Sequence, residues 1–288
     1  MTEAGPVGFI GLGVMGGAMV RRLMGAGYEV HIHARTPESA APFLANGARW
    51  AEDAATLART CRTVFTIVGG PDDVAELYLG EAGLIAHAAP GSVLVDMTTS
   101  TPDLARRITA EAQARGVMTL DAPVTGGAPG AEVGTLTFMV GGEAEALKAV
   151  RPMLSIMGAT IFAMGPAGAG QTTKASNQVA VAGILMGLAE ALHHAETAGL
   201  DPANVLEVLT TGTAGGPLMQ RLGPKMAAGD TTASFAIDHF IKDLGIALDT
   251  APLPAARLCR DLYRDISEAG GGAKGIQALI ETYRCPRS

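Results

Sequence analysis

The sequence predicts an α/β fold, a doubly wound and mostly parallel sheet, followed by an all-α domain that begins with a long interdomain helix. Apolar strand-like runs alternate with helical patterns over the first half of the chain. The segment at residues 165–170 is rich in glycine, and beyond it strand-like runs nearly vanish. We therefore expect one domain over residues 1–164 and a second over residues 165–288, which a chain of 288 residues is long enough to form.

The expected strands are continuous apolar runs rather than alternating ones, which is typical of a parallel sheet covered on both faces. They are Val7–Ile10, Val30–His33, Thr63–Val68, Val93–Met97, Met118–Ala122, Leu136–Gly141 and Thr160–Met164. Helical patterns such as Pro102–Arg115 and Glu143–Ile156 lie between them. Right-handed crossovers through these helices then give the doubly wound arrangement.

The second domain is expected to contain four helical stretches. They are Gln171–Ala198, Asp201–Thr210, Ile237–Thr250 and Leu253–Glu268. The first of them is apolar on most of its circumference, which favours burial both by its own domain and by a second subunit. We therefore expect a homodimer or homotetramer. The longest apolar stretch of this helix, Val179–Ala189, is too short to cross a bilayer.

Composition and charge narrow the classes of function. Hydrophobic residues make up 48% of the chain and charged residues 17%, which is typical of a compact globular protein. The net charge of −7 gives no reason to expect nucleic-acid binding, and the first strand begins too early for a signal peptide. Cys61, Cys259 and Cys285 lack metal-ligand spacing, so we expect reduced, structural residues. These observations favour a cytoplasmic protein without a membrane partner or a metal.

A glycine-rich turn directly follows the first strand and precedes a helical pattern. In a Rossmann-type domain, such a turn binds the pyrophosphate of a dinucleotide at the helix N-terminus. The first glycine permits the tight turn, the second lets backbone N–H groups approach the phosphates, and the third lets helix and strand pack closely. The alternative is a purely structural turn. The expected cofactor-binding residues of the turn are Gly11, Gly13, Val14, Met15 and Gly16.

The residues after the second strand indicate which dinucleotide binds. An NAD enzyme usually places Asp or Glu there to hold the ribose 2′-hydroxyl, and no acid lies between His31 and Pro37. Arg35 and the hydroxyl of Thr36 are instead suited to a 2′-phosphate. NADP(H) is therefore favoured, NAD(H) is possible, and the alternative reading of Arg35 is a solvated loop residue.

Two further segments offer groups for a substrate. After one strand, Thr125, Gly126 and Gly127 combine a hydroxyl with unshielded backbone N–H groups, which suits a carboxylate; the alternative is an ordinary glycine-rich turn. Lys174, early in the long helix, shares a helix face with Asn177 and Gln178. A helix N-terminus disfavours a cation and lowers its pKa, which suits a general base, although a surface lysine is the alternative.

A late helix carries a second lysine, Lys242, which is followed directly by Asp243. Neighbouring residues point in different directions on a helix, so we do not expect these two to form a simple pair. From the sequence pattern, a solvated helix face and a position reaching into the cleft between the two expected domains are equally plausible for Lys242.

Taken in order, four segments resemble the β-hydroxyacid dehydrogenase family, which includes 3-hydroxyisobutyrate dehydrogenase and tartronate semialdehyde reductase. The resemblance covers essentially the whole chain, with a C-terminal domain similar to that of 6-phosphogluconate dehydrogenase. The segments are the cofactor turn Gly11 to Gly16, the substrate loop Asp121 to Gly130, the catalytic segment Gly168 to Asn177 and the late Lys-Asp-Leu motif within Phe240 to Leu244.

The resemblance implies an NAD(P)-dependent oxidoreductase that interconverts a small 3-hydroxyacid and its semialdehyde or keto acid. Lys174 would be the acid/base toward the substrate oxygen, and Asn177 would hold the substrate. Thr125, Gly126 and Gly127 would bind the carboxylate of the substrate. Thr98 would lie near the nicotinamide, and Lys242 near the cofactor and the substrate.

Three residues depart from the pattern of that family. Thr125 stands where Ser is most frequent, Gln178 where many members have a second Asn, and Ala34 where NADP-preferring members commonly have Asn. The last departure weakens the preference for NADP. Two other functions remain as alternatives, an imine reductase-like NADPH enzyme and a non-catalytic NADP-binding module. Lys174 counts against both, because imine reductases usually have Asp or Tyr at that position and a non-catalytic module would be expected to lose the lysine.

Overall fold

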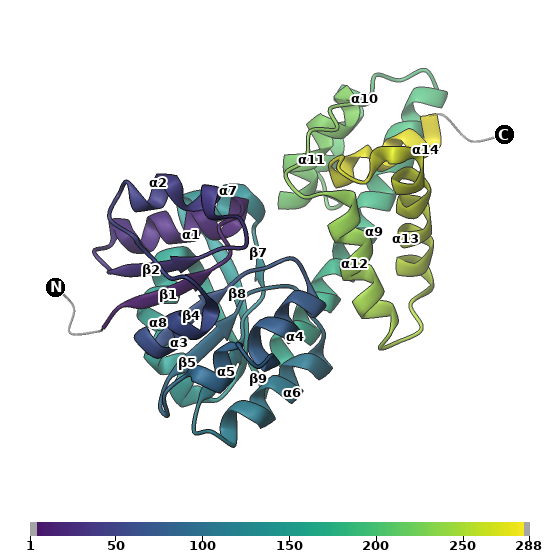
Figure 1. Cartoon of the computed structure of the whole chain (residues 1–288). Helices are drawn as coiled ribbons and strands as arrows, with labels where there is room; N and C mark the ends of the chain where they lie inside the picture. Colours follow the sequence, from purple (N-terminus) through teal and green to yellow (C-terminus); the bar gives the residue numbers. More distant parts are fainter. Residues whose placement is uncertain (1–4, 285–288) are drawn as a thin grey trace. The chain divides into compact units, whose positions relative to one another are not determined.

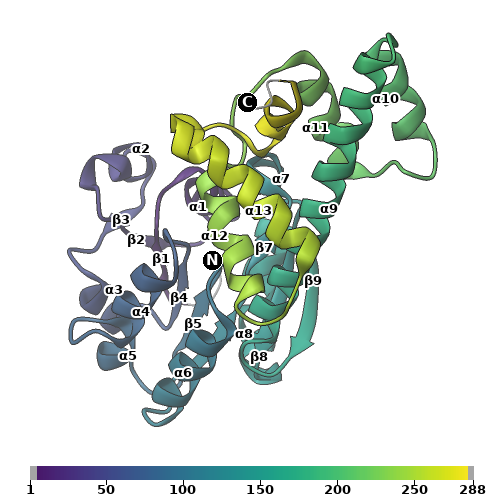
Figure 2. The ribbon, with the colours of Figure 1, turned by 90° about the vertical axis from the view of Figure 1, so that its right-hand side faces the viewer.

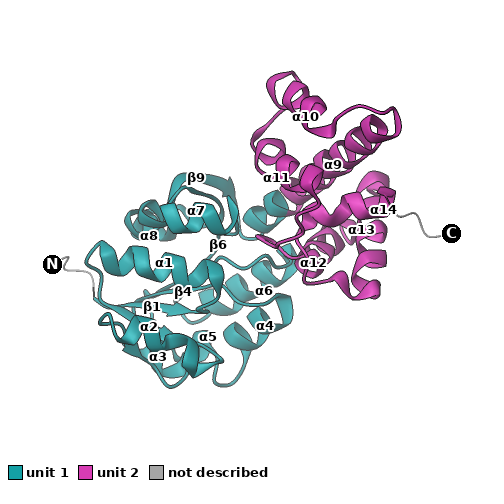
Figure 3. Ribbon diagram, turned by 90° about the horizontal axis from the view of Figure 1, so that it is seen from above, with its two compact units in different colours: residues 1–174 teal, residues 175–288 magenta. Residues whose placement is uncertain are grey.

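The computed structural model describes residues 5–284, and these belong to two compact units (Figure 3). The first unit extends to Lys174 and the second begins at Ala175. This division falls inside helix α9 (Ala169–Thr197). The domain boundary at residue 164 stays a prediction.

The first unit contains a sheet of nine strands among the described residues (Figure 1). The strand order is β3-β2-β1-β4-β5-β6-β8-β7, with β9 paired to β8. The strands are β1 (Val7–Ile10), β2 (Val30–His33), β3 (Arg49–Trp50), β4 (Thr63–Thr66), β5 (Val93–Asp96), β6 (Met118–Asp121), β7 (Val124–Thr125), β8 (Leu136–Gly142) and β9 (Gly158–Gly165).

The pairing of these strands confirms the predicted mostly parallel sheet. The six strands from β3 to β6 in the sheet order are mutually parallel, and so are β8 and β9, which run side by side in Figure 2. Only the contacts of β8 with β6 and β7 are antiparallel in the described part of the sheet. Because parallel strands share their direction, the carboxyl ends of β1, β2, β4, β5 and β6 meet at one edge.

Helices cover both faces of this sheet, as the continuous apolar strands require. Val93 and Val95 of β5 pack into one core with residues of α1 and α8, whereas Leu94 between them packs into a second core with residues of α3 to α6. The helices are α1 (Val14–Gly25), α2 (Ala41–Leu44), α3 (Ala54–Thr60), α4 (Pro71–Leu79), α5 (Leu84–His87), α6 (Pro102–Gln113), α7 (Gly127–Val133) and α8 (Ala144–Met157), with a 3₁₀ turn η1 (Pro37–Ala40).

The named elements of the second unit are all helices among its described residues, with one isolated β-bridge between Ala236 and Gly275, which confirms the predicted fold class. Its core gathers residues of α9, α11, α12 and α13, among them Leu185, Phe240 and Tyr263. Gly199 adopts φ +74° just after α9, a backbone conformation that ends a helix. The remaining elements are α10 (Pro202–Thr211), α11 (Pro217–Ala228), α12 (Ile237–Leu248), α13 (Pro254–Ile266), the π-helical turn η2 (Ser267–Gly271), the 3₁₀ turn η3 (Ile276–Ile280) and α14 (Glu281–Arg284).

Helix α9 is longer than its apolar centre suggests. The stretch Val179–Ala189, predicted to be too short to cross a bilayer, is part of a 29-residue helix. By length and composition the whole helix could cross a membrane, contrary to that prediction. This is weak evidence, because the core helices of globular proteins satisfy the same criterion. Leu185 and Leu188 of this helix are fully buried in the core of the second unit, whereas Ile184 is 42% exposed.

Two of the three cysteines lie within the described residues, one in each unit. Cys61 and Cys259 are both buried and free of disulfides, as expected for structural residues. Burial raises the pKa of each thiol to about 12. Cys285 lies outside the described residues.

Candidate active site

The glycine turn between β1 and α1 combines two kinds of glycine. A Cβ at Gly11 would lie 2.0 Å from the carbonyl oxygen of Ile67, and one at Gly16 would lie 1.9 Å from that of Gly11. The packing of the chain therefore excludes a side chain at both positions. Gly13, the residue before α1, has φ −65° and would carry a Cβ with no protein atom within 4 Å. The space around Gly13 fits a dinucleotide phosphate that approaches the backbone.

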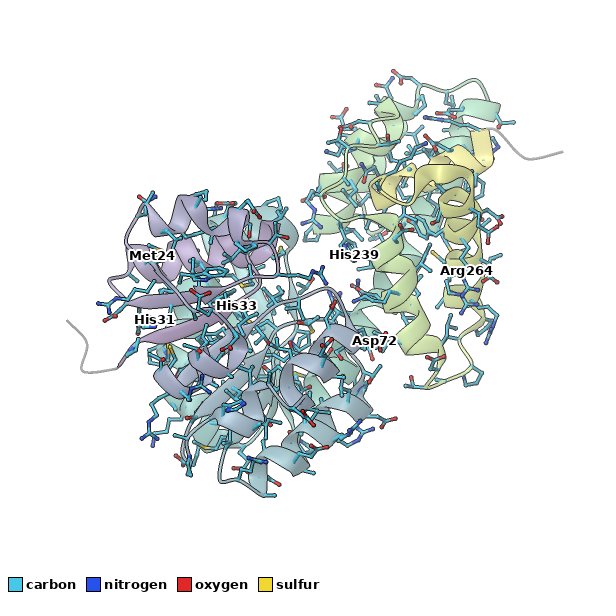
Figure 4. The ribbon with its side chains drawn as sticks, viewed as in Figure 1. Met24, His31, His33, Asp72, His239 and Arg264 are labelled. Atoms are coloured by element: carbon cyan, nitrogen blue, oxygen red, sulfur yellow. The ribbon has the colours of Figure 1, made fainter. Side chains whose placement is uncertain are left out.

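The turn after β2 presents the residues expected at the adenosine end of the cofactor. Arg35 and Thr36 are both exposed, and the side chain of Thr36 caps no amide of η1. Arg35 extends to Asp73 in the first turn of α4, with 3.3 Å between Nη1 and Oδ1. His33 lies just before them (Figure 4). Its ring lies 5.4 Å from that of Trp50, and its Nδ1 contacts the Ala51 carbonyl at 3.0 Å.

A buried carboxylate organises the carboxyl end of β5. Asp96 Oδ1 accepts hydrogen bonds from the Thr98 backbone N–H and the Thr66 hydroxyl, each at 3.0 Å. Thr66 Oγ1 in turn lies 2.9 Å from the hydroxyl of Tyr78 on α4. Burial of Asp96 raises its pKa to about 6, against the opposing effect of these donors. Thr98 itself is buried, and its Oγ1 accepts a hydrogen bond from the Val68 backbone N–H.

A second buried carboxylate, Asp121 at the end of β6, holds the start of α9. Its Oδ1 accepts from the Gly168 backbone N–H at 2.8 Å, and its Oδ2 accepts from that of Gln171 at 2.9 Å. These are amides at a helix N-terminus, which have no partner inside the helix. Burial raises the pKa of Asp121, although the backbone donors act in the opposite direction. Asp121 therefore fixes the start of the helix that carries Lys174.

Gln171 is a residue of the site that the sequence analysis did not single out. Its side chain is buried, and both the oxygen and the nitrogen of its amide form hydrogen bonds. Oε1 accepts from the Ser100 backbone N–H at 2.9 Å, and Nε2 donates to the Thr98 carbonyl at 2.8 Å. It thereby attaches the first turn of α9 to the loop after β5. Its position three residues before Lys174, one helical turn away, was the available signal.

The structure brings the predicted acid/base and the predicted carboxylate loop together within the first unit. Lys174 is buried, and its Nζ donates to the Val124 carbonyl at 3.0 Å, directly before Thr125. Gly126 and Gly127 have φ +124° and +66°, values that favour glycine. They lead from β7 into α7, so their backbone N–H groups lie at a helix N-terminus, where an anion is favoured.

Two other predicted residues, Asn177 and Lys242, belong to a polar chain in the second unit. Asn177 Nδ2 donates to Gln178 Oε1 at 3.0 Å, and Gln178 Nε2 donates to Asp243 Oδ2 at 2.8 Å. Lys242 Nζ lies 3.3 Å from Asp243 Oδ1, in an ion pair without hydrogen-bond geometry. The expectation that Lys242 and Asp243 do not pair was wrong, because a lysine side chain is long enough to fold back toward the next residue.

Comparison with known proteins matches both parts of the chain. Residues 6–165 match the model of the NAD binding domain of 6-phosphogluconate dehydrogenase, which covers more than half of the chain. Residues 168–283 match the model of the NAD-binding domain of NADP-dependent 3-hydroxyisobutyrate dehydrogenase. The chain belongs to the β-hydroxyacid dehydrogenase family. The chain is therefore an NAD(P)-dependent oxidoreductase of the hydroxyacid dehydrogenase class.

Individual relatives of this family align over nearly their whole length. The chain is 40% identical to a probable 3-hydroxyisobutyrate dehydrogenase-like protein 2, mitochondrial, of Arabidopsis thaliana, over 96% of this chain and 93% of that protein. It is 36% identical to an NAD-dependent L-serine dehydrogenase of Pseudomonas aeruginosa, over 96% of this chain and 97% of that one. A structure of Mycobacterium tuberculosis 3-hydroxyisobutyrate dehydrogenase with L-serine superposes with a TM-score of 0.89 at 31% identity, covering 98% of this chain and 100% of that chain.

Proposed function

We propose that this β-hydroxyacid dehydrogenase interconverts a small 3-hydroxyacid and the corresponding semialdehyde or keto acid, with Lys174 as the acid/base. The contact of Lys174 Nζ with the Val124 carbonyl supports this proposal most directly. In this position the buried amine of Lys174 lies next to the loop of Thr125, Gly126 and Gly127. One small substrate is therefore able to contact both the amine and the loop. L-Serine, named with two of the relatives, is itself a small 3-hydroxyacid.

In this proposal the substrate carboxylate binds at Thr125 and the two following backbone N–H groups. The substrate oxygen lies against Lys174, which takes its proton during oxidation and returns it during reduction. The nicotinamide, when bound, supplies the hydride chemistry. Asn177, one helical turn after Lys174, holds the substrate, and Lys242 lies near the cofactor and the substrate. Asp121 and Gln171 keep the start of α9, and with it Lys174, in place.

For the cofactor, we propose that Gly11, Gly13, Val14, Met15 and Gly16 hold the pyrophosphate and that Thr98 lies near the nicotinamide. Arg35 and Thr36 would bind a 2′-phosphate, which favours NADP(H) over NAD(H). The NAD-dependent relative keeps NAD(H) as the second candidate. We also propose a homodimer or homotetramer, since the long helix α9 leaves Ile184 exposed.

Replacement of Lys174 tests the proposed chemistry. Lys174→Ala should reduce kcat by about 10²–10⁴-fold, because this is the typical contribution of a general acid/base. NADPH binding, measured by fluorescence titration, should stay within twofold of the wild-type value. Lys148→Ala, which removes an exposed lysine of α8, is the matched control and should leave kcat unchanged. Unchanged turnover in Lys174→Ala would refute the role of Lys174.

A substrate panel tests the substrate class. The panel consists of short semialdehydes reduced with NADPH or NADH, and of the matching 3-hydroxyacids, L-serine included, oxidised with NADP⁺ or NAD⁺. Tight NADPH binding without turnover of any of them would favour a non-catalytic binding module instead.

A further inference from the structure

One ion pair of the first unit lies where the cofactor-selective end of the site is expected. Arg35 follows β2, and Asp73 belongs to α4, which follows β4. Because β2 and β4 flank β1 in the sheet, the pair crosses the carboxyl end of β1, where the glycine turn begins. The pair is thus beside the path that a dinucleotide takes from the glycine turn to the end of β2.

The two partners of this pair are held differently. The Arg35 side chain is 87% exposed, so its position depends on the partner it finds, whereas that of Asp73 is 41% exposed. Asp73 lies close over the preceding turn, since a Cβ on Gly69 would be only 2.3 Å from Asp73 Oδ2. The first turn of a helix also favours an acidic side chain. Asp73 is therefore the less exposed partner and lies against the turn before α4, and its carboxylate holds the more exposed guanidinium of Arg35 toward α4.

A 2′-phosphate on the adenosine ribose needs the same guanidinium. A ribose with a free 2′-hydroxyl does not, so Arg35 is able to remain paired with Asp73 when that ligand binds. Any energy that the ion pair contributes is lost only when Arg35 turns to a phosphate. The pair thus lowers the affinity for one class of dinucleotide and leaves the affinity for the other unchanged.

We propose that Asp73 is a specificity-determining residue for the cofactor, which lowers the preference for 2′-phosphorylated dinucleotides by competing with the 2′-phosphate for Arg35. The proposal rests on the function proposed above only in requiring that the adenosine ribose binds at the end of β2. It assigns a carboxylate on α4, rather than one at the end of β2, to the choice between NADP and NAD.

Calorimetric titration with adenosine 2′,5′-bisphosphate and adenosine 5′-monophosphate tests this proposal without catalysis. Asp73→Asn should tighten binding of the bisphosphate by about two- to fivefold, the range that an exposed ion pair supports, and leave the monophosphate unchanged. Arg35→Gln should weaken the bisphosphate alone. In the Arg35→Gln background, Asp73→Asn should have no further effect, because the competition needs the guanidinium.

Asp72→Asn is the matched control, since it removes the same charge from the adjacent residue of α4 (Figure 4). Asp72 is exposed, and within residues 5–284 the ion pair of Arg35 is with Asp73 and not with Asp72. An equal gain in Asp72→Asn, or a gain that persists undiminished without Arg35, would overturn the proposal in favour of general charge repulsion. If the wild type binds both nucleotides and Asp73→Asn changes neither, this inference fails while the proposed function stands. If the wild type binds neither nucleotide, both fail.

Discussion

At the scale of single residues, the three glycines of the β1–α1 turn differ in what requires them. Gly11 and Gly16 are required by the chain itself, because any Cβ there would overlap a backbone carbonyl oxygen. Gly13 has ordinary backbone angles and open space around it. The fold therefore tolerates a methyl group at Gly13, whereas a phosphate bound against its backbone does not.

Substitutions at Gly13 and Gly16 should therefore have different effects, one on cofactor affinity and the other on the stability of the fold. Gly13→Ala should fold with an unchanged Tm and lose at least about tenfold in NADPH affinity, because the methyl group occupies the space through which the backbone approaches the pyrophosphate. Gly16→Ala is the contrasting variant, and overpacking should cost it about 1–3 kcal/mol of unfolding free energy. The measurements are thermal unfolding and calorimetric titration with NADPH. Wild-type affinity in Gly13→Ala would show that no phosphate lies there.

At the scale of elements, the buried carboxyl of Asp96 connects β5 with β4 and, through Thr66 and Tyr78, with α4. Its pKa is raised from 3.8 to about 6, so the folded state binds a proton more readily than the unfolded state. The contribution of Asp96 to stability is thus fully present below about pH 4. It is lost as the pH rises through about 6, because the ionised form is then buried.

Asp96→Asn should remove this pH dependence. Asparagine keeps an oxygen acceptor for Thr98 and Thr66 and stays neutral, so the variant should gain stability relative to the wild type between pH 4 and 6. A shift of about two pH units corresponds to a gain of about 3 kcal/mol above pH 6. Urea unfolding of both proteins from pH 4 to 8 gives the difference curve. A flat difference curve would mean that Asp96 ionises normally in the folded protein.

The elements also show how far the sequence predicts this protein. Continuous apolar runs identified seven strands, but β3 and β7 span two residues each and carry no pattern of their own. Pairing with a neighbouring strand, not local sequence, makes them strands. Helix α11 was missed because Pro224 interrupts its pattern, whereas Pro217 takes the favourable first position of the helix.

The same limit applies to the candidate site. Motif spacing predicts Lys174 and Thr125 as site residues, and this stays a prediction. The hydrogen bond from Lys174 to the Val124 carbonyl brings Lys174 next to Thr125. Gln171 connects α9 to the loop after β5 through hydrogen bonds to backbone groups that lie 71 and 73 residues away in the sequence. A local sequence pattern does not reveal contacts at that separation. The ion pair of Arg35 with Asp73 likewise depends on which strands flank β1.

At the scale of the whole molecule, each unit has hydrophobic clusters built from its own residues. The chain contains one tryptophan, Trp50, and it belongs to the first unit. Tryptophan fluorescence therefore reports unfolding of that unit, whereas circular dichroism at 222 nm reports the helices of both.

A ligand of the first unit should therefore separate the two signals. With adenosine 2′,5′-bisphosphate at 100 times its Kd, the Trp50 transition in urea should be stabilised by about 2.7 kcal/mol. The circular dichroism transition should become biphasic, since the helices of the second unit gain nothing from this ligand. Coincident transitions at every ligand concentration would show instead that the two units unfold as one cooperative body.

The burial of Cys61 and Cys259 affects how readily these two thiols react with oxidants. Attack on peroxides or disulfides requires a thiolate, and a thiol with a pKa of about 12 is almost entirely protonated at neutral pH. Each sulfur becomes reactive only when the unit around it opens. For these two sulfurs, sensitivity to oxidative modification is thus set by the opening equilibrium of the unit and is separate from the hydride chemistry of the nicotinamide.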